Sequence, residues 1–481
     1  MQTFLPVFES TSRVLLLLTL GWYIILNLQW FSYRFDRLVF HHTKPWWNVA
    51  NVVMPIALFY AAGAYFWLFF YLVYLPTLFL WYRKIDKKLV VTARVKRFFA
   101  LLAFAAALSE SLRFWGAAQD SGTLSALLLT FVCSQVLENF LRFRFKKRAS
   151  RKLLARRELI VILLTASYGK TSLKHFLLDI LKPRFKVYAT PGNVNTDLGI
   201  AADVNNALPS DAQIYIVEAG AREIGDILTI AAMTRPHYAI IGKVGKQHIE
   251  YFKTEENVKR AKREALVSPR MRRAIVHESA DVTPSESIVT LKDGQIENLE
   301  ATLEGTRWDL VLNDRRVRFE TPVLGGFNAV NISLAFLAAR ELGVSEEEIV
   351  RAAGKLANFA HRLQPIKNKY KFILDDSYNG NLEGMLSAIE LCSSWKDRKV
   401  IVTPGIVESD EESNIALATK INEVFDLALI TGALNADLLC SRIDRAKRKR
   451  IYDKRGLEAI LAKETRSGDL ILFANDAPSY V

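Results

Sequence analysis

Long apolar stretches within the first 140 or so residues constrain this chain of 481 residues more than any other feature of its sequence. A helix needs about 20 apolar residues to cross the hydrocarbon core of a membrane. Residues 14–31 meet that length, and residues 98–118 and 123–141 come close to it. The last two stretches carry ionisable residues, namely Glu110, Arg113 and Glu138. The pattern predicts an α-helical transmembrane region rather than the core of a soluble domain.

A fourth apolar stretch, residues 48–82, is longer than one span requires and contains no Lys or Arg. It predicts either one long tilted helix or a tight hairpin that is broken near Gly63 or Pro76. We therefore expect four spans and hold five as the alternative. No basic segment precedes the first apolar run and no small-residue cleavage site follows it, so we expect no cleavable signal peptide.

The formal net charge of +14 suggests an anionic partner, and the position of the charge favours a membrane over nucleic acid. Two strongly basic segments, residues 82–97 and 142–157, flank apolar stretches, whereas residues 117–123 carry no positive charge. Lys and Arg concentrate on the cytoplasmic side of membranes, so we expect a multi-pass protein of the inner (cytoplasmic) membrane with its C-terminal part in the cytoplasm. The second segment is expected to contact anionic membrane lipids, and the alternative is a solvated linker. We expect no nucleic acid partner, because the sequence has no RNA-binding motif.

Residues 158–181 contain a β-branched run, a turn of small residues and an amphipathic helical pattern, in that order. Backbone N–H groups at the start of a helix attract anions, and this order of elements is typical of a phosphate-binding loop. Gly169 would let the backbone approach a phosphate, Lys170 would neutralise the β- and γ-phosphates, and Thr171 would ligate Mg²⁺. The alternative is an ordinary strand–turn–helix, because Leu164 stands at the first glycine of the full Walker pattern.

Three residues further along the chain give this motif a context. Glu218 ends a second apolar strand, His248 follows a third, and Lys262 comes fourteen residues after His248. This order resembles the central domain of the Mur ligases, in which a phosphate-binding loop is followed by a metal-binding glutamate, a histidine and a carbamylated lysine. The resemblance implies that ATP and two Mg²⁺ ions are bound, and that Lys262 carries a carbamate.

The resemblance also implies a set of site residues. The expected catalytic residues are Lys170, Glu218, His248 and Lys262, and the expected metal ligands are Thr171, Glu218, His248 and Lys262. The expected ATP-binding residues are Ser167, Gly169, Lys170, Thr171, Ser172, Asn328, Asn331, Arg362 and Asp376. The expected substrate-binding residues are Asn193, Asn195, Thr196, Tyr378, Asn379 and Asn381.

Later segments extend the resemblance. Residues 324–356 predict two helices joined at a glycine, and they resemble the family segment G-R-H-N-x-x-N, with Asn328 and Asn331 at the asparagines. The segment HRLQ resembles G-R-L-E and keeps its arginine as Arg362. Residues 371–385 resemble D-x-Y-N-x-N-P, which favours the type that adds D-Ala-D-Ala over the types that add single amino acids. The alternative for this last segment is an Asx-rich turn after a strand.

Alternating strand and helix patterns continue to the C-terminus and predict a Rossmann-like domain with a mostly parallel sheet. The expected fold is an α-helical transmembrane region followed by two α/β domains. We expect the transmembrane region over residues 1–145, with a basic linker to 157. A P-loop-type ATP-binding domain is then expected over 158–360, and the Rossmann-like domain over 361–481.

The resemblance implies an ATP-dependent amide-bond ligase of peptidoglycan synthesis. It would form an acyl phosphate on a precursor carboxylate and add D-Ala-D-Ala to UDP-MurNAc-tripeptide, with membrane lipids and other cell-wall precursor enzymes as further partners. The chain departs from the family at Ala166 in the loop, in its ending ANDAPSYV, and in leaving no room for the usual uridine-binding domain. Two alternatives therefore stay open: a ligase for another acceptor, such as a poly-γ-glutamyl capsule or a lipid-linked precursor, and a non-catalytic membrane scaffold.

Overall fold

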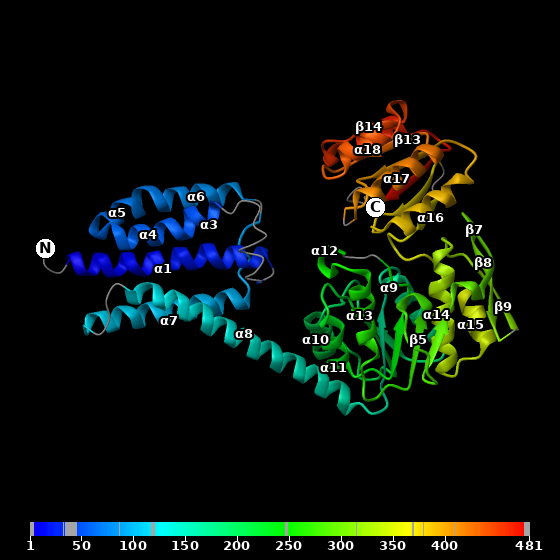
Figure 1. Ribbon diagram of the computed structural model, residues 1–481, viewed down its shortest axis with the longest axis horizontal. Helices are drawn as coiled ribbons and strands as arrows, with labels where there is room; N and C mark the ends of the chain where they lie inside the picture. Colours follow the sequence, from blue (N-terminus) through cyan, green and yellow to red (C-terminus); the bar gives the residue numbers. More distant parts are fainter. Residues whose placement is uncertain are drawn as a thin grey trace. The chain divides into compact units, whose positions relative to one another are not determined.

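The computed structural model describes most of the chain, in two compact units that divide after Arg144. The described ranges are 4–31, 33, 46–85, 87–116, 121–245, 249–313, 315–367, 370–378, 380–407 and 409–475. Figure 1 shows that the first unit is helical and that the second contains α/β layers.

The first unit is a bundle of helices. Its elements are α1 (Phe4–Trp30), α3 (Trp46–Asn48), α4 (Met54–Ala61), α5 (Phe66–Phe69), α6 (Leu75–Lys84), α7 (Ala93–Phe114) and the first part of α8 (Ser121–Ala155). Short π-helical and 3-10 turns join the pieces from α3 to α6. Among the described residues, three helices are long and apolar enough to cross a membrane by length and composition: residues 6–30, 63–84 and 123–155. Of the expected span over residues 98–118, residues 98–114 are helical as part of α7, and α7 is not one of these three helices.

The longest apolar stretch folds as a hairpin, which is the second of its two expected forms. The chain turns at Gly63, whose φ is +51°, and the helical segments on either side lie alongside each other in Figure 1. The ring centroids of Trp47 and Trp81 are 5.6 Å apart. The Tyr74 hydroxyl donates to the Asn51 carbonyl oxygen at 3.0 Å. The hairpin splits this stretch into two helical segments, of which only residues 63–84 qualify as a candidate span, and the number of spans stays a prediction.

The ionisable residues that interrupt the apolar stretches are paired inside the bundle. Arg13 on α1 donates to both carboxylate oxygens of Glu110 on α7, at 2.9 and 3.0 Å. Arg97 on α7 donates to Glu138 on α8 at 2.7 Å. Charged residues within membrane segments are usually paired with one another and face the bundle interior, so these residues are compatible with a membrane location.

The middle part of the second unit is built on a six-stranded parallel sheet of order β2-β3-β1-β4-β5-β6. Its strands are β1 (Ile160–Thr165), β2 (Val187–Ala189), β3 (Ile214–Glu218), β4 (Tyr238–Ile241), β5 (Arg273–His277) and β6 (Ile288–Leu291). Successive residues of a strand point to opposite faces. Ile162 and Leu164 therefore join one buried apolar cluster, and Val161 and Leu163 join the other. Both faces are covered, as is usual for a parallel sheet.

Helices form the outer layers on the two faces of this sheet (Figure 1). The first apolar cluster includes residues of α9 (Lys170–Leu181), α14 (Phe327–Glu341) and α15 (Glu346–Ala353). The second includes residues of α10 (Asp197–Asn206), α11 (Asp226–Thr234) and α13 (Glu255–Arg263). A short helix, α12 (Ile249–Phe252), precedes α13. The expected pair of helices joined at a glycine is confirmed as α14 and α15.

A small antiparallel sheet, β7-β8-β9, was not among the predicted elements. Its strands are β7 (Ile296–Thr302), β8 (Gly305–Leu312) and β9 (Arg315–Thr321). The stacked rings of Trp308 and Phe319 lie 4.8 Å apart, and Phe319 meets the ring of Phe336 on α14 edge to face at 5.4 Å. The small sheet is therefore joined to the first apolar cluster of the middle part.

The C-terminal part has a second six-stranded sheet, of order β10-β11-β15-β12-β13-β14. Its strands are β10 (Gln364–Lys367), β11 (Phe372–Asp376), β12 (Lys399–Thr403), β13 (Leu427–Ile430), β14 (Arg448–Arg450) and β15 (Leu470–Ala474). The β10–β11 pair is antiparallel and the other pairs are parallel. One face packs against α16 (Leu382–Ser393), α17 (Glu411–Val424) and α18 (Ala436–Arg442), and the other against α19 (Leu457–Glu464). The expectation of a mostly parallel sheet is confirmed.

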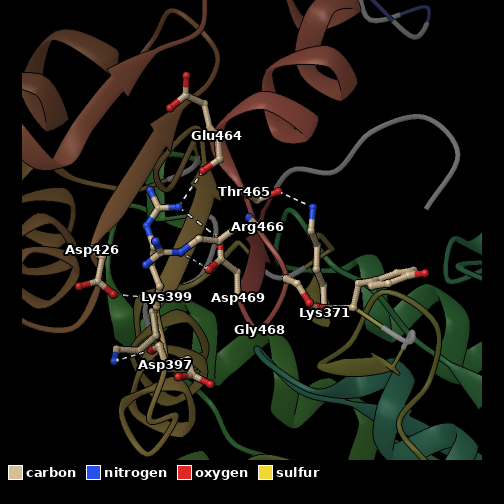
Figure 2. A network of polar contacts seen from close by, with 12 residues as sticks. Lys371, Asp397, Lys399, Asp426, Glu464, Thr465, Arg466, Gly468 and Asp469 are labelled. Atoms are coloured by element: carbon tan, nitrogen blue, oxygen red, sulfur yellow. Dashed lines mark hydrogen bonds and ion pairs between the residues drawn. The ribbon is translucent and has the colours of Figure 1, made fainter.

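A polar network joins the amino ends of strands in this second sheet (Figure 2). Arg398, next to the start of β12, donates to the buried carboxylate of Asp469 at 3.2 Å and to the carbonyl oxygen of Glu464 at 2.7 Å. Lys371 donates to the Thr465 hydroxyl at 2.6 Å. Ligands of parallel α/β sheets bind at the opposite, carboxyl ends of the strands. The network therefore stabilises the sheet and lies away from the candidate site.

The basic linker is helical, because α8 continues through it to Ala155. Ala149 and Leu153 are buried in the apolar cluster that includes α10. Lys146 pairs with Asp197 at 3.0 Å, and Lys152 donates to the carbonyl oxygen of Val204 at 2.8 Å. Part of the positive charge is therefore used within the second unit. Contact of the linker with anionic lipid stays a prediction.

Candidate active site

Three adjacent strands of the middle sheet end at one edge, and their last residues begin the site. The order β3-β1-β4 places β1 between the other two, and all three are parallel. Thr165 ends β1, Glu218 ends β3 and Ile241 ends β4. The loops that follow these strands therefore meet at the carboxyl edge, where α/β sheets bind ligands.

The loop after β1 has the conformation that its glycine permits. Gly169 has a φ of +71°, which L-residues rarely adopt. A Cβ at this position would lie 2.7 Å from the Asn331 amide nitrogen. Helix α9 begins at the next residue, so its first N–H groups are available to an anion. The Ser167 hydroxyl donates to the Gly245 carbonyl oxygen at 3.1 Å, which ties the loop to the segment after β4.

Lys170 is folded back onto the loop. Its ammonium donates to the carbonyl oxygens of Ala166 at 2.7 Å and Ser167 at 3.0 Å. Burial lowers the pKa of Lys170 to about 8, the negative charge of Glu218 opposes this shift, and the positive charge of Arg362 adds to it. A polyphosphate would favour the charged form of the same ammonium, because an opposite charge stabilises it.

Glu218 lies at the centre of the buried polar contacts. One carboxylate oxygen, Oε1, lies 3.4 Å from the Thr171 hydroxyl and 3.3 Å from the Asn195 amide nitrogen, and both groups donate to it. The other oxygen, Oε2, lies 3.0 Å from the Lys174 ammonium. Carboxylate and hydroxyl oxygens are the ligands that Mg²⁺ prefers, so Thr171 and Glu218 fit the expected cation. Lys174 is a site residue that the sequence reasoning missed.

The residues expected to hold a second cation are only partly described. Lys262, on α13, is buried. Burial holds its pKa well below the usual value, the charge of Lys170 lowers it further, and Asp226 and Glu264 oppose the shift. His248 lies outside the described residues. Within the described ranges, no group of three or more His, Cys, Asp or Glu side chains is gathered as a metal site, so the second cation stays a prediction.

Two expected nucleotide-binding asparagines lie beside the loop. Asn328 and Asn331 are buried on α14, and the Asn331 amide donates to the Asn328 side-chain oxygen at 3.1 Å. Both line a small pocket together with Gly169, Ser172 and other residues. The pocket is lined by Tyr168, Gly169, Ser172, Lys243, Phe327, Asn328, Val330, Asn331, Arg362, Asp376, Asn381, Glu383 and Gly384. These expected residues are therefore brought together with the phosphate-binding loop.

Arg362 is presented by an unusual backbone. The residues on either side, His361 and Leu363, have φ values of +61° and +50°. The family segment has glycine at the position of His361, where a left-handed conformation is free of strain. Here His361 is held by a 2.7 Å contact between its Nδ1 and the Asp375 carboxylate. The Arg362 guanidinium lies 4.9 Å from the centre of the Tyr378 ring.

The expected substrate-binding residues have mixed positions. Asn193 donates a hydrogen bond to the Tyr378 hydroxyl, so these two lie together. Thr196 and Asn381 accept from backbone N–H groups as the N-caps of α10 and α16. Asn379 lies outside the described residues.

Asp376, expected at the nucleotide, is buried, and its carboxylate accepts from the Leu363 N–H at 3.1 Å. That contact fixes the backbone beside Arg362. The roles of these residues toward ligands stay predictions.

A cleft of about 1320 Å³ opens in front of the phosphate-binding loop. Pockets for one small ligand usually measure roughly 300–1,000 Å³, so this cleft has room for a nucleotide and a second substrate. Its walls include Ser167, Tyr168, Gly169, Lys170, Thr171, Gly245, Lys253, Thr254, Glu255, Arg362, Tyr378, Gly380, Asn381, Leu382, Glu383, Leu386, Val407, Ser409, Asp410, Glu412, Ser413, Ala416 and Asn475.

Comparison with known proteins finds one family that the middle part of the chain resembles. Residues 164–339 match the Mur ligase middle domain. A UDP-N-acetylmuramoyl-tripeptide–D-alanyl-D-alanine ligase of Bacillus subtilis is 25% identical over 333 residues, which cover 65% of this chain and 72% of that enzyme. The matched segment is therefore similar to the central domain of the Mur ligases. The enzyme of the same name from Escherichia coli is 27% identical over 290 residues. The aligned region covers 57% of this chain and 64% of that enzyme.

A solved structure shows that the fold of the second unit is similar to that of a Mur ligase. The MurF ligase of Thermotoga maritima, solved in complex with ADP, superposes with a TM-score of 0.60 at 23% identity. The superposition covers 69% of this chain and 80% of that one. The matched middle domain contains the loop, metal and asparagine positions of the site, namely Lys170, Thr171, Glu218, Lys262, Asn328 and Asn331.

Proposed function

We propose that the chain is an ATP-dependent ligase that adds D-Ala-D-Ala to UDP-MurNAc-tripeptide in peptidoglycan synthesis. The observation that carries the proposal is the meeting of Lys170, Thr171 and Glu218 at one sheet edge, in front of a cleft of about 1320 Å³. The relatives from B. subtilis and E. coli are named for this reaction. A non-catalytic scaffold would not need a buried lysine and carboxylate at a phosphate-binding loop.

The reaction proceeds in two steps on the substrates. A carboxylate oxygen of the tripeptide attacks the γ-phosphorus of ATP, the bond to the β–γ bridging oxygen breaks, and ADP leaves. The amine nitrogen of D-Ala-D-Ala then attacks the acyl carbon, phosphate leaves, and the amine gives up a proton to solvent. Lys170 and Arg362 neutralise the charge that develops on the transferred phosphoryl group. Asp410 and Glu412 line the same cleft and suit the ammonium group of the zwitterionic dipeptide before that group loses its proton.

Divalent cations are part of the proposal. Mg²⁺ bound by Thr171 and Glu218 would neutralise the phosphates and hold the attacking and leaving oxygens in line. Lys262 suits carbamylation, because burial holds its pKa well below the usual value and so favours the neutral amine that reacts with CO₂. Its carbamate would be an anion where an ammonium would repel a second cation. His248 is proposed as a partner in that second set.

We also propose that the chain is anchored in the inner (cytoplasmic) membrane by several spans, with its catalytic unit in the cytoplasm. The support is the three long apolar helices and the basic segments beside them. Alkaline carbonate washing of membranes tests this, because an integral protein stays in the pellet. Release of the full-length chain into the wash would contradict the proposal.

One observation favours a second acceptor class. Residues 1–144 form a helical unit of their own, where the resemblance leads us to expect a uridine-binding domain. A lipid-linked precursor would then be held by its membrane anchor instead of by a uridine nucleotide. The reaction and the site residues would be the same.

The test of the proposed function is ATP-dependent phosphate release by the full-length chain in detergent. With Mg²⁺ and UDP-MurNAc-tripeptide, we expect release with D-Ala-D-Ala and not with single amino acids. Lys170→Ala should abolish it, whereas Lys182→Ala, at the exposed end of the same helix, should not. Phosphate release with a lipid-linked tripeptide but not with UDP-MurNAc-tripeptide would show that the acceptor is a lipid-linked precursor. Unchanged phosphate release by Lys170→Ala would contradict the assignment of the site.

A further inference from the structure

Lys174 lies one turn after Lys170 on α9 and is completely buried. Lysine is almost never fully buried unless it is paired. Here the pairing partners are all close to the proposed cation site. The ammonium donates to the Thr190 carbonyl oxygen at 2.9 Å and to the Gly192 carbonyl oxygen at 2.7 Å. It lies 3.0 Å from Oε2 of Glu218.

The ammonium has three N–H donors. Two of them donate to the loop between β2 and α10, which also carries Asn193 and Asn195. The contact with Oε2 of Glu218, the carboxylate that the proposed function assigns to Mg²⁺, is an ion pair at 3.0 Å and not a hydrogen bond, because Oε2 accepts none within the described ranges. Lys174 therefore connects α9, the end of β3 and the loop of the expected substrate-binding residues.

The two carboxylate oxygens of Glu218 contact different groups. Oε2 meets Lys174, while Oε1 meets the Thr171 hydroxyl and the Asn195 amide. Thr171 is the hydroxyl that follows the phosphate-binding Lys170, so Oε1 is on the side where a nucleotide-bound cation would sit. The ammonium holds the other oxygen in place.

We propose that Lys174 is a positioning residue that reserves Oε2 of Glu218, so that Oε1 alone ligates the cation, and that it ties this ligand to the substrate loop. The inference rests on the proposed function, because it takes the cation site from there. Groups that orient a metal ligand typically contribute 10–100-fold to metal affinity or activity. The link to the loop further implies that cation binding and acceptor binding are coupled through Lys174.

The experiment measures Mn²⁺ binding to the full-length chain in detergent, with a non-hydrolysable ATP analogue present, from the electron paramagnetic resonance signal of free Mn²⁺. Lys174→Met keeps the length of the side chain and removes its charge. We expect it to weaken Mn²⁺ binding about tenfold or more. The matched control is Lys182→Met, because Lys182 is exposed on the same helix and pairs with Asp179. The control should bind Mn²⁺ as the parent does.

A second variant is needed because Lys174→Met leaves the Glu218 carboxylate buried and unpaired and can prevent folding. Lys174→Arg keeps the charge, but a larger planar guanidinium cannot donate to the Thr190 and Gly192 carbonyl oxygens from the compact position that also places the charge 3.0 Å from Oε2. If Lys174→Met does not fold, Lys174→Arg decides. Affinity within threefold of the parent overturns the inference, and a larger loss supports it.

Kinetics separate positioning from simple stabilisation. Loss of a positioning residue changes the kinetic constants of each enzyme molecule. Whichever Lys174 variant folds should therefore need more Mg²⁺ for half-maximal phosphate release and show a raised KM for the acceptor. A structural role would lower the amount of active enzyme and leave both constants unchanged, which overturns the inference. Mn²⁺ binding requires no acceptor. Failure of the parent to bind Mn²⁺ with nucleotide would reject the proposed function, whereas normal binding by parent and Lys174→Met alike would reject this inference.

Discussion

Gly169→Ala probes the phosphate-binding loop through two separate physical effects. The residue has a φ of +71°, and a left-handed conformation costs an L-residue about 1–2 kcal/mol. The new Cβ would also lie 2.7 Å from the Asn331 amide. Moving that amide breaks its hydrogen bond to Asn328, which is worth about 1 kcal/mol. The expected loss of stability is therefore about 2–3 kcal/mol in total.

Gly343→Ala is the matched control, because Gly343 has a φ of +83° and nothing lies within 4 Å of its added Cβ. It should show the conformational strain without the clash. At about 2–4 °C per kcal/mol for a domain of this size, thermal shift should find a larger fall in Tm for Gly169→Ala than for Gly343→Ala. ATP should raise the Tm of the parent and of Gly343→Ala, and not that of Gly169→Ala. Equal falls in Tm together with an intact ATP response would refute the reasoning.

Three further predictions concern charge. Lys170 has a pKa of about 8 in the free enzyme, so ATP affinity should fall as the pH rises above 8, as measured by titration calorimetry. Lys170→Arg, which stays charged, should show a flat profile over the same range. In the unfolded chain the pKa of Lys170 is about 10.4, which is higher than the value of about 8 in the folded protein. Between about pH 8 and about pH 10.4 the unfolded chain therefore binds more protons than the folded protein. In that pH range Lys170 makes the free energy of unfolding rise with pH. If Lys262 is carbamylated, activity should fall when CO₂ and bicarbonate are removed and return when bicarbonate is added, while Lys262→Arg should not respond. In the helical unit, Arg13→Met leaves the carboxylate of Glu110, otherwise held at 2.9 Å, without its partner. It should destabilise the protein by up to about 3–5 kcal/mol, and Arg13→Met with Glu110→Leu should recover most of the Tm.

The parts of the site that follow from local sequence were predictable. Short segments with clear hydrophobic periodicity predict three elements of the site: the turn at Gly169, the helix that begins at Lys170 and the strand that ends at Glu218. Their meeting at one edge also follows, because parallel strands that alternate with helices end on the same side of a sheet. The two helices α14 and α15 were readable for the same reason.

Features of the site and the fold that depend on tertiary contacts could not be predicted from the sequence. Lys174 sits at an ordinary helix position, and its burial against Glu218 depends on three segments far apart in the sequence. The strained backbone at His361 is held by Asp375, fourteen residues away. The linker after the last apolar stretch was expected as a basic connection, yet it is helical because Ala149 and Leu153 pack into the second unit.

The β7-β8-β9 sheet is an element that we did not predict, although its strands carry a signal. In β9, Val317 and Phe319 alternate with Arg316, Arg318 and Glu320, which is the pattern of a strand with one buried face. Trp308 and Phe319 supply the buried face together with α14. The packing of that face on α14 depends on tertiary contacts that the local pattern does not give.

The most direct test of the central claim is the position of the cation beside the phosphate-binding loop. Crystals of the full-length chain grown with Mn²⁺ and a non-hydrolysable ATP analogue would locate the metal by its anomalous scattering. We predict a peak within about 2.0–2.2 Å of both Glu218 Oε1 and the Thr171 hydroxyl, the range for a small divalent cation bound by oxygen. A nucleotide bound at Gly169–Thr171 with its metal away from both side chains would contradict the account.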